Sequence, residues 1–390
     1  MRSHRRLRLV LLATAVISVA NAGAQYLRGL RDPLDTDYGG AFSVAAHMLS
    51  NGQTNIYCTP CQHDVLAQLY HVAPVYFPIG YANPPLAAWL LQPLTHLPLA
   101  WGAGIFLSLS LLSTIIAVAL GVRLHRAARA AAATGPLITV LALFALLPGG
   151  QTFALAQWDG FLLLAAVAAV TLFPTRPVLG GLVLSILCVK PQLAWIAPLA
   201  LLGTRHWRAG MGFAIGLAVW VGSTLAIVGT TGAADWIHNV LPIQEQLVSI
   251  TISVAGILSA LGAPTLAVAV VTGLIAAGLL GLMASRPALR TTPVAEVVGV
   301  ALLWTLAVTP HLLPHDLILA GLPLLLWARR DATGPLLAAL AINVAYLADV
   351  ILPASVAHLQ AIVLAAAAVS YTRVLMGTAT ESTAMAAATQ

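Results

Sequence analysis

Asp37 lies in a polar stretch of an otherwise apolar chain, and its carboxylate could act as a general base. It precedes the sequence YGGAFSVAAHML, whose apolar residues recur at helical spacing until Asn51-Gly52 ends the run. The carboxylate, or the hydroxyl of Thr36, could simply cap this helix by accepting hydrogen bonds from its first N–H groups. Alternatively, Asp37 could take a proton from an acceptor hydroxyl at a membrane surface. Both roles are compatible with the pattern.

Lys190 is the only lysine of the chain, and it interrupts an apolar region in the sequence CVKPQLAW. A lysine in hydrocarbon costs about 2.5–3.5 kcal/mol unless it is paired or reaches water. It could be a structural residue whose side chain extends to the membrane surface. Its compact ammonium could instead bind phosphate oxygens. We favour the phosphate clamp, because nothing else in this segment makes an inward lysine useful.

Two histidines, His311 and His315, stand four residues apart in TPHLLPHDLIL. This spacing could hold a metal ion on a regular helix, but Pro314 disrupts the helix and no third ligand is evident. We therefore expect no metal site, and we expect these histidines to help hold a phosphate. Asp316 next to them could serve only as a helix cap.

A third polar group, Gln157-Trp158-Asp159, opens an apolar segment in ALAQWDGFLLL. Asp159 near a helix N-terminus interacts favourably with the helix dipole, so it could be purely structural. It could equally line a cavity and bind sugar hydroxyls. The residues leave both possibilities open.

The cysteines do not indicate redox catalysis. Cys58 and Cys61 form a CTPC sequence beside His63, without the βαβ context of a thioredoxin-like site and with too few ligands for zinc. In an oxidising compartment we expect a local disulfide between them. Cys188, beside Lys190, is expected to be a buried small apolar residue.

The composition shows which elements must position these residues. Of 390 residues, 60% are hydrophobic and only 8% are charged, and the mean hydropathy is +0.93. So few charges cannot cover a soluble fold, and apolar stretches recur to the C-terminus, which excludes a secreted protein with one cleaved signal. Three cysteines exclude a disulfide scaffold, and a net charge of +6 spread over many loops excludes a nucleic-acid binder. The composition predicts an all-α polytopic membrane protein.

Arginine clusters set the expected topology, because arginine is retained in cytoplasmic loops. With both termini cytoplasmic, about 12 transmembrane helices place every cluster on the inner side. The expected spans are 8–27, 100–121, 136–149, 155–173, 178–189, 191–203, 210–230, 264–285, 293–309, 312–328, 333–351 and 355–372. The segment 84–98 is predicted to be a juxtamembrane helix, since counting it as a span would move most arginines outside.

This layout divides the chain into three parts. Residues 1–230 form a catalytic module with a long outer loop at 32–99 that carries amphipathic helices, 231–373 form a second transmembrane module, and 374–390 form a disordered cytoplasmic tail. The polar residues converge on one membrane face, which favours a site at the outer interface over a channel.

The order of these motifs resembles a known family. Asp37-Tyr38-Gly39 is followed by Gly52 and Tyr57, then by Tyr81 with Pro84-Pro85, and by a PLxxLP sequence ending at Pro98. Later come Gln157, Lys190-Pro191, an arginine cluster at 205–208, and a proline–histidine sequence at 310–315. Over about 30–330 the chain resembles GT-C-fold glycosyltransferases that use polyprenyl-phosphate sugars, in particular family 87, the bacterial α-mannosyltransferase-like group.

The resemblance implies an enzyme that transfers a sugar, with mannose expected, from a polyprenyl-phosphate donor to a glycolipid or glycan acceptor. It implies inversion at the anomeric carbon, with Asp37 as the base, Lys190, His315 and His311 near the donor phosphate, and no cofactor. Asp35, Tyr81, Gln157 and Asp159 are expected to bind substrates. The implied location is the bacterial cytoplasmic membrane, with the active site on its outer face.

Two positions depart from the family pattern and leave donor and acceptor identity open. Ala41 replaces a tyrosine, and Gln157 is followed by Trp-Asp. Two other functions remain possible at this stage. Twelve crossings also suit a secondary transporter, although no internal repeat is evident and the acidic outer loop has no role in transport. The chain could also be a non-catalytic flippase, ligase relative or assembly scaffold.

Overall fold

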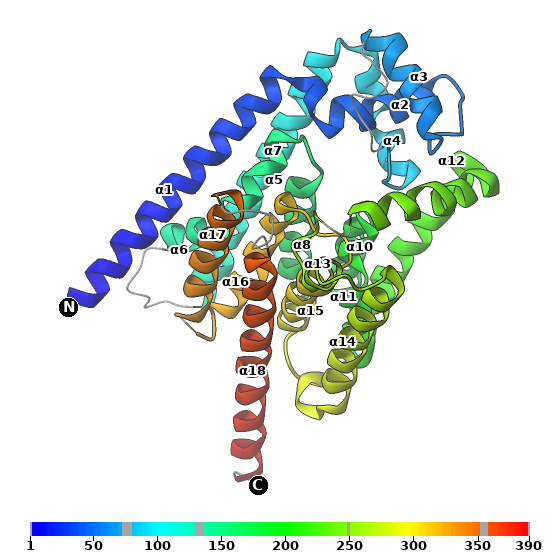
Figure 1. Ribbon diagram of the computed structural model, residues 1–390. Helices are drawn as coiled ribbons and strands as arrows, with labels where there is room; N and C mark the ends of the chain where they lie inside the picture. The colour runs from blue at the N-terminus through cyan, green and yellow to red at the C-terminus, as the bar shows by residue number, and fades with distance from the viewer. Residues whose placement is uncertain are drawn as a thin grey trace.

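The computed structural model describes residues 2–71, 80–128, 136–247, 250–331, 333–351 and 358–388. All regular structure in these residues is helical, and none of them forms a strand. An all-α membrane protein is therefore what the fold shows. Figure 1 shows a bundle of helices with a smaller layer of short helices at one end, formed by the loop after the first helix.

The first half of the chain contains α1 (Arg2–Arg31), α2 (Ser43–Ser50), α3 (Thr59–Tyr70), α4 (Pro85–Leu91), α5 (Leu99–Ala128), α6 (Pro136–Phe144), α7 (Gln151–Ala154), α8 (Asp159–Leu172), α9 (Pro177–Leu184), α10 (Pro191–Ala194) and α11 (Ile196–Gly203). The second half contains α12 (Trp207–Leu247), α13 (Val254–Ala260), α14 (Thr265–Ser285), α15 (Val294–Val308), α16 (Gly321–Trp327), α17 (Gly334–Ile351) and α18 (Leu359–Ala388). Short tight turns of helix connect them: η1 (Pro33–Asp35), η2 (Tyr38–Phe42), η4 (Gln92–His96), η5 (Pro148–Gly150), η6 (Ser185–Val189), η8 (Pro287–Arg290) and η9 (Pro314–Ala320).

The first loop forms a layer of α2, α3 and α4 over one end of the bundle. Ser43–Ser50 packs against Pro85–Leu91 and the following turn η4, and α4 also contacts α12. Pro85 at the first helical position starts α4, because its fixed φ suits that position and its missing N–H would be unpaired there. The segment 84–98 thus forms two short helices, α4 and η4, and its juxtamembrane place stays a prediction.

Five helices in the described part of the chain are long and apolar enough to cross a membrane: Leu99–Arg126, Trp207–His238, Thr265–Ser285, Gly334–Ile351 and Leu359–Gly377. A sixth candidate is the pair Leu137–Phe144 and Pro148–Ala154, which bends by 75° at its break. The protein is accordingly a multi-pass membrane protein, but the expected count of about 12 spans is not confirmed.

The remaining apolar segments are shorter helices of 10–17 residues, including Asp159–Leu172, Val294–Val308 and Pro314–Trp327. They are too short for the ~20 residues that a span across hydrocarbon needs. Nearly every residue of α15 and α16 is buried inside the protein. Their apolar residues pack against other helices, and these segments are not among the candidate spans.

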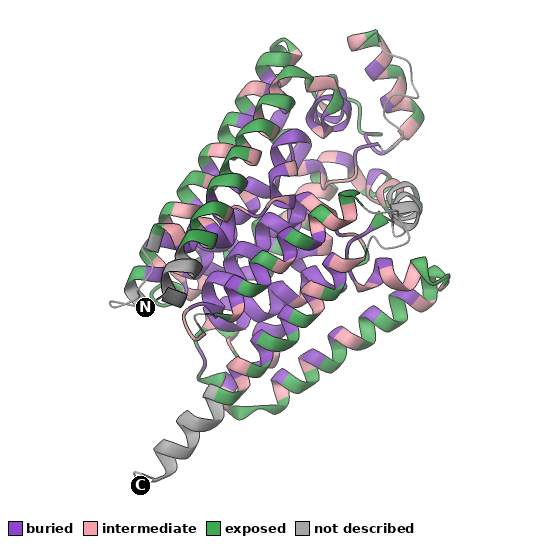
Figure 2. Ribbon diagram, turned by 60° about the vertical axis from the view of Figure 1, so that its left-hand side comes forward, coloured by how far each residue is buried: buried purple, intermediate pink, exposed green. Residues whose placement is uncertain are grey.

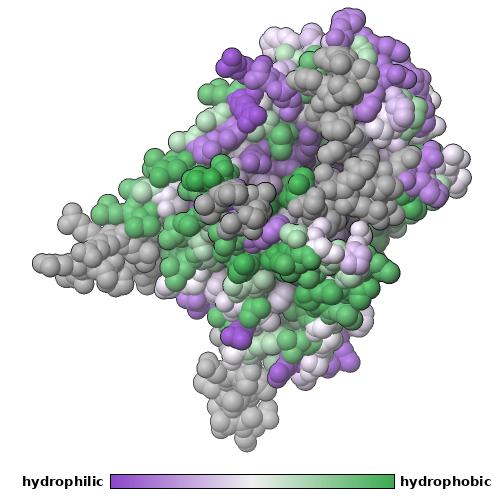
Figure 3. All heavy atoms as spheres, viewed as in Figure 1, coloured by the Kyte–Doolittle hydropathy of each residue, from purple (hydrophilic) through white to green (hydrophobic). Residues whose placement is uncertain are grey.

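One hydrophobic core runs through the bundle, with buried members from Tyr38 to Leu375. Figure 2 shows this buried interior surrounded by helices whose outer faces are exposed. The core includes residues on both sides of position 230, and α11 packs against α14 and α15. On the surface, Figure 3 shows hydrophobic side chains across the bundle and hydrophilic ones over the α2–α4 layer. Such an apolar outer face is suited to lipid.

The last helix, α18, runs to Ala388 and so includes most of the residues for which the sequence predicts a cytoplasmic tail. Alanine has the highest helix propensity, so the alanine-rich end can extend the preceding helix without tertiary contacts.

Candidate functional site

Asp37 is held at the inner side of the first loop by the segment that follows α7. Its backbone N–H donates to the carbonyl of Leu155 at 2.9 Å, and Gln157 Nε2 donates a hydrogen bond to Asp37 Oδ2. The carboxylate makes no helix-capping bond. Instead, Thr36 Oγ1 accepts from the N–H of Gly39 at 3.1 Å, so Thr36 performs the capping role. Asp37 is a half-buried residue, and its carboxylate is held by Gln157 and not by a helix N-terminus.

The backbone of the loop after α7 is held by a left-handed residue and by hydrogen bonds. Ala156 has φ +48°, in the left-handed region that costs an L-residue with a Cβ roughly 1–2 kcal/mol. Next to it, the N–H of Gln157 donates to Thr152 O at 2.8 Å. Thr152 Oγ1 donates to the carbonyl of His315 at 3.0 Å, which ties the loop to η9. The loop thus contacts Asp37 on one side and the histidine segment on the other.

Four buried groups form a charged cluster beneath this loop: Asp159, Lys190, His315 and Asp316. Lys190 Nζ donates to both carboxylate oxygens of Asp159 at 2.9 Å and to Asp316 Oδ1 at 2.7 Å. His315 Nε2 lies 3.6 Å from Asp316 Oδ1 and 4.0 Å from Asp159 Oδ2. None of the four side chains is more than 6% exposed. With His315 neutral, two carboxylates and one ammonium leave a net charge of −1.

Local sequence explains how each side chain reaches the cluster. Asp159 is the first residue of α8, and Lys190 ends η6 just before Pro191 starts α10. Asp316 lies in η9, where its other oxygen, Oδ2, accepts from the N–H of Leu313 at 2.8 Å. The capping role considered for Asp316 is therefore real, but the same carboxylate also binds Lys190.

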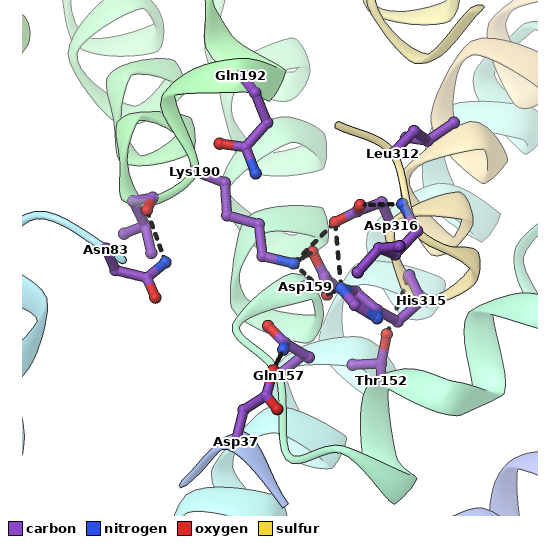
Figure 4. Close-up of polar contacts among 12 residues, drawn as sticks. Asp37, Asn83, Thr152, Gln157, Asp159, Lys190, Gln192, Leu312, His315 and Asp316 are labelled. Atoms are coloured by element: carbon purple, nitrogen blue, oxygen red, sulfur yellow. Dashed lines mark hydrogen bonds and ion pairs between the residues drawn. The ribbon is translucent and has the colours of Figure 1, made fainter. Parts of the chain in front are cut away.

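Figure 4 shows that these segments bring Asp37, Gln157, Asp159, Lys190 and His315 to one place, although the sequence separates Asp37 from His315 by most of the chain. Asp37 is close enough to the cluster to be affected by its charges. Burial raises the pKa of Asp37 from 3.8 to about 6, while Lys190 lowers it and Asp316 raises it. A carboxyl group of this kind changes protonation near neutral pH, as a general base must.

His311 lies in the turn between α15 and η9, at the edge of the cluster. Burial lowers the pKa of His311 from 6.5 to about 4, with Asp316 raising it and Lys190 lowering it. His311 is thus neutral at pH 7. In the part of the chain that the structure describes, the buried Nδ1 atoms of His311 and His315 have no hydrogen-bond partner. These two atoms are available to a ligand.

Three predicted site residues lie elsewhere or have structural partners. Tyr81 is buried, and its hydroxyl donates to Pro84 O at 2.7 Å while its ring stacks on Tyr57. This bonding uses the hydroxyl proton of Tyr81 to shape the turn before α4, and the substrate contact expected from the sequence stays a prediction. Asp35 is exposed in η1 and is not part of the cluster. Asp159 uses both carboxylate oxygens on Lys190, so sugar binding by this residue would have to compete with an ion pair.

The cysteine pair lies at the start of α3. Cys58 and Cys61 form a disulfide with a Cα–Cα distance of 5.2 Å. Cys188 is a buried free thiol near Lys190 in the sequence. The disulfide belongs to the α2–α4 layer and not to the charged cluster.

Sequence reasoning gave Asp316 no functional role, and it overlooked Thr152 and Asn83. The sequence did indicate a role for Asp316, because an acid inside an apolar run needs a cation or an N–H group that donates to its carboxylate. Thr152 carried none, since its contact is to a backbone carbonyl far along the chain. Asn83 Nδ2 donates to Val189 O at 2.9 Å and so joins the outer loop to the residue before Lys190.

Asp159, His315 and Asp316 could in principle hold a metal ion, because their ligand atoms all lie within 4.8 Å of one another. However, the Lys190 ammonium is bound to oxygens of both carboxylates. A metal ion would have to displace this ammonium or share the carboxylates with it, which two like charges in a buried site disfavour.

The fold and the site define a multi-pass helical membrane protein with one buried charged cluster beneath a structured loop. Comparison with known families identifies the class more closely, because the family model of glycosyltransferase family 87 matches residues 81–310. The match covers more than half of the chain, and the protein belongs to this family of GT-C-type glycosyltransferases. It is a membrane glycosyltransferase, and the transporter alternative is set aside. Neither the comparison with curated proteins nor that with solved structures found a match.

The matched region contains Gln157, Asp159 and Lys190. Asp37 precedes it, and His311 and His315 follow it. The family match therefore supports the class of reaction, while the roles of the outlying residues depend on the geometry of the cluster.

Proposed function

We propose that this glycosyltransferase transfers a sugar, with mannose as the expected one, from a polyprenyl-phosphate carrier to a hydroxyl of a glycolipid or glycan. A polyprenyl chain is too apolar to leave the bilayer, so an enzyme must bind its phosphate–sugar head at the interface. The observation that carries this proposal is the convergence of Asp37 with Lys190 and His315 (Figure 4), with His311 near enough for Lys190 and Asp316 to act on its charge. A base and a phosphate-binding group are the two parts that such a transfer needs.

In this mechanism, Asp37 takes the proton of the acceptor hydroxyl while the acceptor oxygen attacks the anomeric carbon. The bond from that carbon to the phosphate oxygen breaks, and its electron pair leaves with the polyprenyl phosphate. Attack opposite the leaving group inverts the anomeric configuration. Gln157 orients the Asp37 carboxylate through its hydrogen bond. The raised pKa of Asp37 supports the assignment, because a base with a pKa of about 6 is ionised and still reactive near neutral pH.

The phosphate side is assigned to Lys190, His315 and His311. Since Asp159 and Asp316 already balance Lys190, a phosphate must share the ammonium with them. The unpartnered Nδ1 atoms of the two histidines are the groups best placed to add hydrogen bonds to it. We propose that no divalent metal is required and that Lys190, shared between the two carboxylates and the phosphate, is the cation on the leaving-group side.

The proposed location is the cytoplasmic membrane of a bacterium, with both termini cytoplasmic and the site on the outer face. The supporting feature is the distribution of arginines. Arg126 in the last turn of α5, the arginines between α11 and α12, and those after α14 stand at the ends of helices that run away from the α2–α4 layer, as cytoplasmic loops require.

The decisive experiment measures sugar transfer by purified protein in detergent from polyprenyl-phosphate mannose to a mixed glycolipid extract. Asp37→Asn should lower kcat by roughly 10²–10⁴-fold, the usual contribution of a general base. Asp64→Asn is the matched control, because Asp64 is an exposed acid of the same outer layer and lies outside the cluster. Its activity should equal that of the wild type.

A panel of donors tests the remaining choices. Transfer from a nucleotide sugar but not from the polyprenyl-phosphate sugar would overturn the proposed donor. Transfer of polyprenyl-phosphate arabinose in place of mannose would revise only the sugar. Equal product from Asp37→Asn and the wild type would remove Asp37 as the base, and no product from any donor would favour a non-catalytic member of the family.

A further inference from the structure

A cavity separate from the charged cluster lies between α14, α15 and α18. This groove has a volume of about 440 Å³. Apolar side chains line most of it, including Ile275 and Leu279 of α14 and Val369 and Met376 of α18. Figure 1 shows α14 and α18 running away from the α2–α4 layer, so the groove lies near the opposite membrane face.

Among the polar side chains that line the groove, one charged group, Arg373, has no ion-pair partner in the described part of the chain. Trp304 Nε1 donates to Thr372 Oγ1 at 2.9 Å, and Thr372 Oγ1 donates to Ala368 O at 2.7 Å, so both are satisfied. Arg373 also lines the groove, is exposed, and has no ion-pair partner in the described part of the chain. A deep apolar slot with a cation at its edge matches an amphiphile with an anionic head.

Two more arginines stand at the same end. η8 follows α14 directly and packs against both α14 and α18. Arg286 caps α14 and Arg290 ends η8, and both are exposed. The turn that joins α14 to α15 therefore carries two positive charges and packs against α18, the helix of Arg373.

Two acidic residues at this end, Glu296 and Asp331, have partners of their own. Glu296 Oε2 accepts from the Tyr371 hydroxyl at 2.7 Å and lies 3.3 Å from Arg330 Nε. Asp331 accepts from the backbone N–H groups of Thr333 at 2.9 Å and Gly334 at 3.1 Å. Among the side chains that the structure describes, neither of these two acids forms an ion pair with the three arginines.

We propose that this groove is a binding site for an anionic phospholipid of the adjoining leaflet. One acyl chain occupies the apolar slot between α14 and α18, and the phosphate head contacts Arg373, with Arg286 and Arg290 adding long-range attraction. The site is separate from the catalytic cluster and does not depend on the proposed sugar transfer. It anchors the C-terminal helix to α14 through a lipid.

The test is native mass spectrometry of the full-length protein in detergent, titrated with dioleoylphosphatidylglycerol or dioleoylphosphatidylcholine. The first lipid should bind more tightly than the second. Arg373→Gln should weaken binding of phosphatidylglycerol by roughly fivefold, the loss expected for one arginine near an anionic head group. Arg208→Gln is the control, since Arg208 is an exposed arginine that does not line the groove.

A second variant tests the apolar slot itself. Gly278 lines the groove, and a Cβ on it would meet open space, so Gly278→Trp should fill the slot without disturbing the packing. Gly273→Trp is its control, because Gly273 on the same helix also faces open space but does not line the groove. Only the first should lose the bound lipid.

Several outcomes would overturn the proposal. Equal affinity for the two lipids would show that the arginines do not select an anionic head. Retention of phosphatidylglycerol by Gly278→Trp would show that the lipid lies elsewhere. Equal weakening by Arg208→Gln and Arg373→Gln would indicate a diffuse charge effect instead of a site. Sugar transfer is measured separately, so a failure here leaves the proposed function untouched.

Discussion

At the scale of single residues, the environment of Asp37 decides what its carboxylate can do. A solvated aspartate has a pKa far below neutral pH, so its carboxylate is a weak base. In this protein burial raises the pKa of Asp37 to about 6, and Gln157 holds one carboxylate oxygen. The same side chain would be a helix cap if Thr36 did not already bond the N–H of Gly39.

The first prediction concerns pH. If Asp37 is the base, log kcat/KM for sugar transfer should rise with pH and level off with a midpoint near 6, the pKa of the buried carboxyl group. The check is a pH profile in which protein stability is followed in parallel. A flat profile between pH 5 and about 7 would count against Asp37 as the base.

Gln157→Leu provides a control for that profile. The Gln157 amide donates to the ionised carboxylate, so its loss should raise the pKa of Asp37 further and move the midpoint to higher pH. A purely structural role for Gln157 would lower activity at every pH without moving the midpoint.

The contribution of Asp37 to stability changes with pH in the opposite direction to its contribution to activity: it falls as the pH rises. Because the pKa of Asp37 is higher in the folded protein than in the unfolded chain, its protonated form stabilises the fold. This contribution is complete below pH 3.8 and is lost as pH rises through about 6. An asparagine cannot ionise, so Asp37→Asn does not lose this stability as the pH rises. The Tm of the variant at alkaline pH should therefore not fall below that of the wild type, although its activity should be lower.

The cluster gives a prediction about ion pairing. Lys190→Met leaves Asp159 and Asp316 as two buried carboxylates with no ammonium between them, and should cost roughly 3–5 kcal/mol. Asp316→Asn should cost less, because Lys190 keeps both oxygens of Asp159. Thermal unfolding in detergent would rank the two variants. The reverse order would show that Asp316 matters mainly as the cap of Leu313.

At the scale of elements, the site depends on two broken helices that meet inside the bundle. The turn η5 with α7, and η9 with α16, pack against each other, and Thr152 and His315 are bonded across them. Pro148 and Pro314 start these segments, since proline suits a first helical position and cannot continue a preceding helix. Loops and helix ends, where backbone groups are free, thus supply the side chains of the cluster.

Gly149 gives the prediction at this scale. A Cβ on Gly149 would lie 3.0 Å from Ile318 Cα, so Gly149→Ala should force the two segments apart and destabilise the protein by about 1–3 kcal/mol. Sugar transfer should fall with it, because the Thr152–His315 contact would move. Gly222→Ala is the control, since a Cβ there meets open space. Equal stability and activity of both variants would mean that this contact does not position the site.

At the scale of the whole molecule, the arginines and the outer layer define two unlike ends. The α2–α4 layer covers the end that holds the cluster, while arginine-bearing turns such as η8 occupy the other. Arginines retained on the inner side would place the layer outside and the turns in the cytoplasm. A substrate would then reach Asp37 from the outer face.

Cysteine labelling in intact spheroplasts tests this orientation. Ser50→Cys lies at the end of α2 and is exposed, and Ser285→Cys lies at the end of α14 next to Arg286. A membrane-impermeant maleimide should label the first directly and the second only after the membrane is permeabilised. Cys58 and Cys61 are bonded and Cys188 is buried, so the wild type provides the background. The reverse pattern would invert the topology.

Composition and local pattern were sufficient for the fold class and for several elements. A chain with 8% charged residues has to be a membrane protein, and Pro84-Pro85 has to start a short helix. Lys190 could be singled out from the sequence because a lone lysine in an apolar region is costly without a partner. These conclusions need only local chemistry, which every sequence carries.

Long-range packing decided the rest. No local pattern predicts that Asp159 and Asp316 bind the same ammonium or that Gln157 donates to Asp37. Nor does one predict that the Tyr81 hydroxyl donates to Pro84 O. Nor does hydropathy separate an interior helix such as α15 from a membrane span, because protein and lipid are equally apolar surroundings. Contacts between residues far apart in the chain, and the length available to each helix, exist only once the bundle has folded.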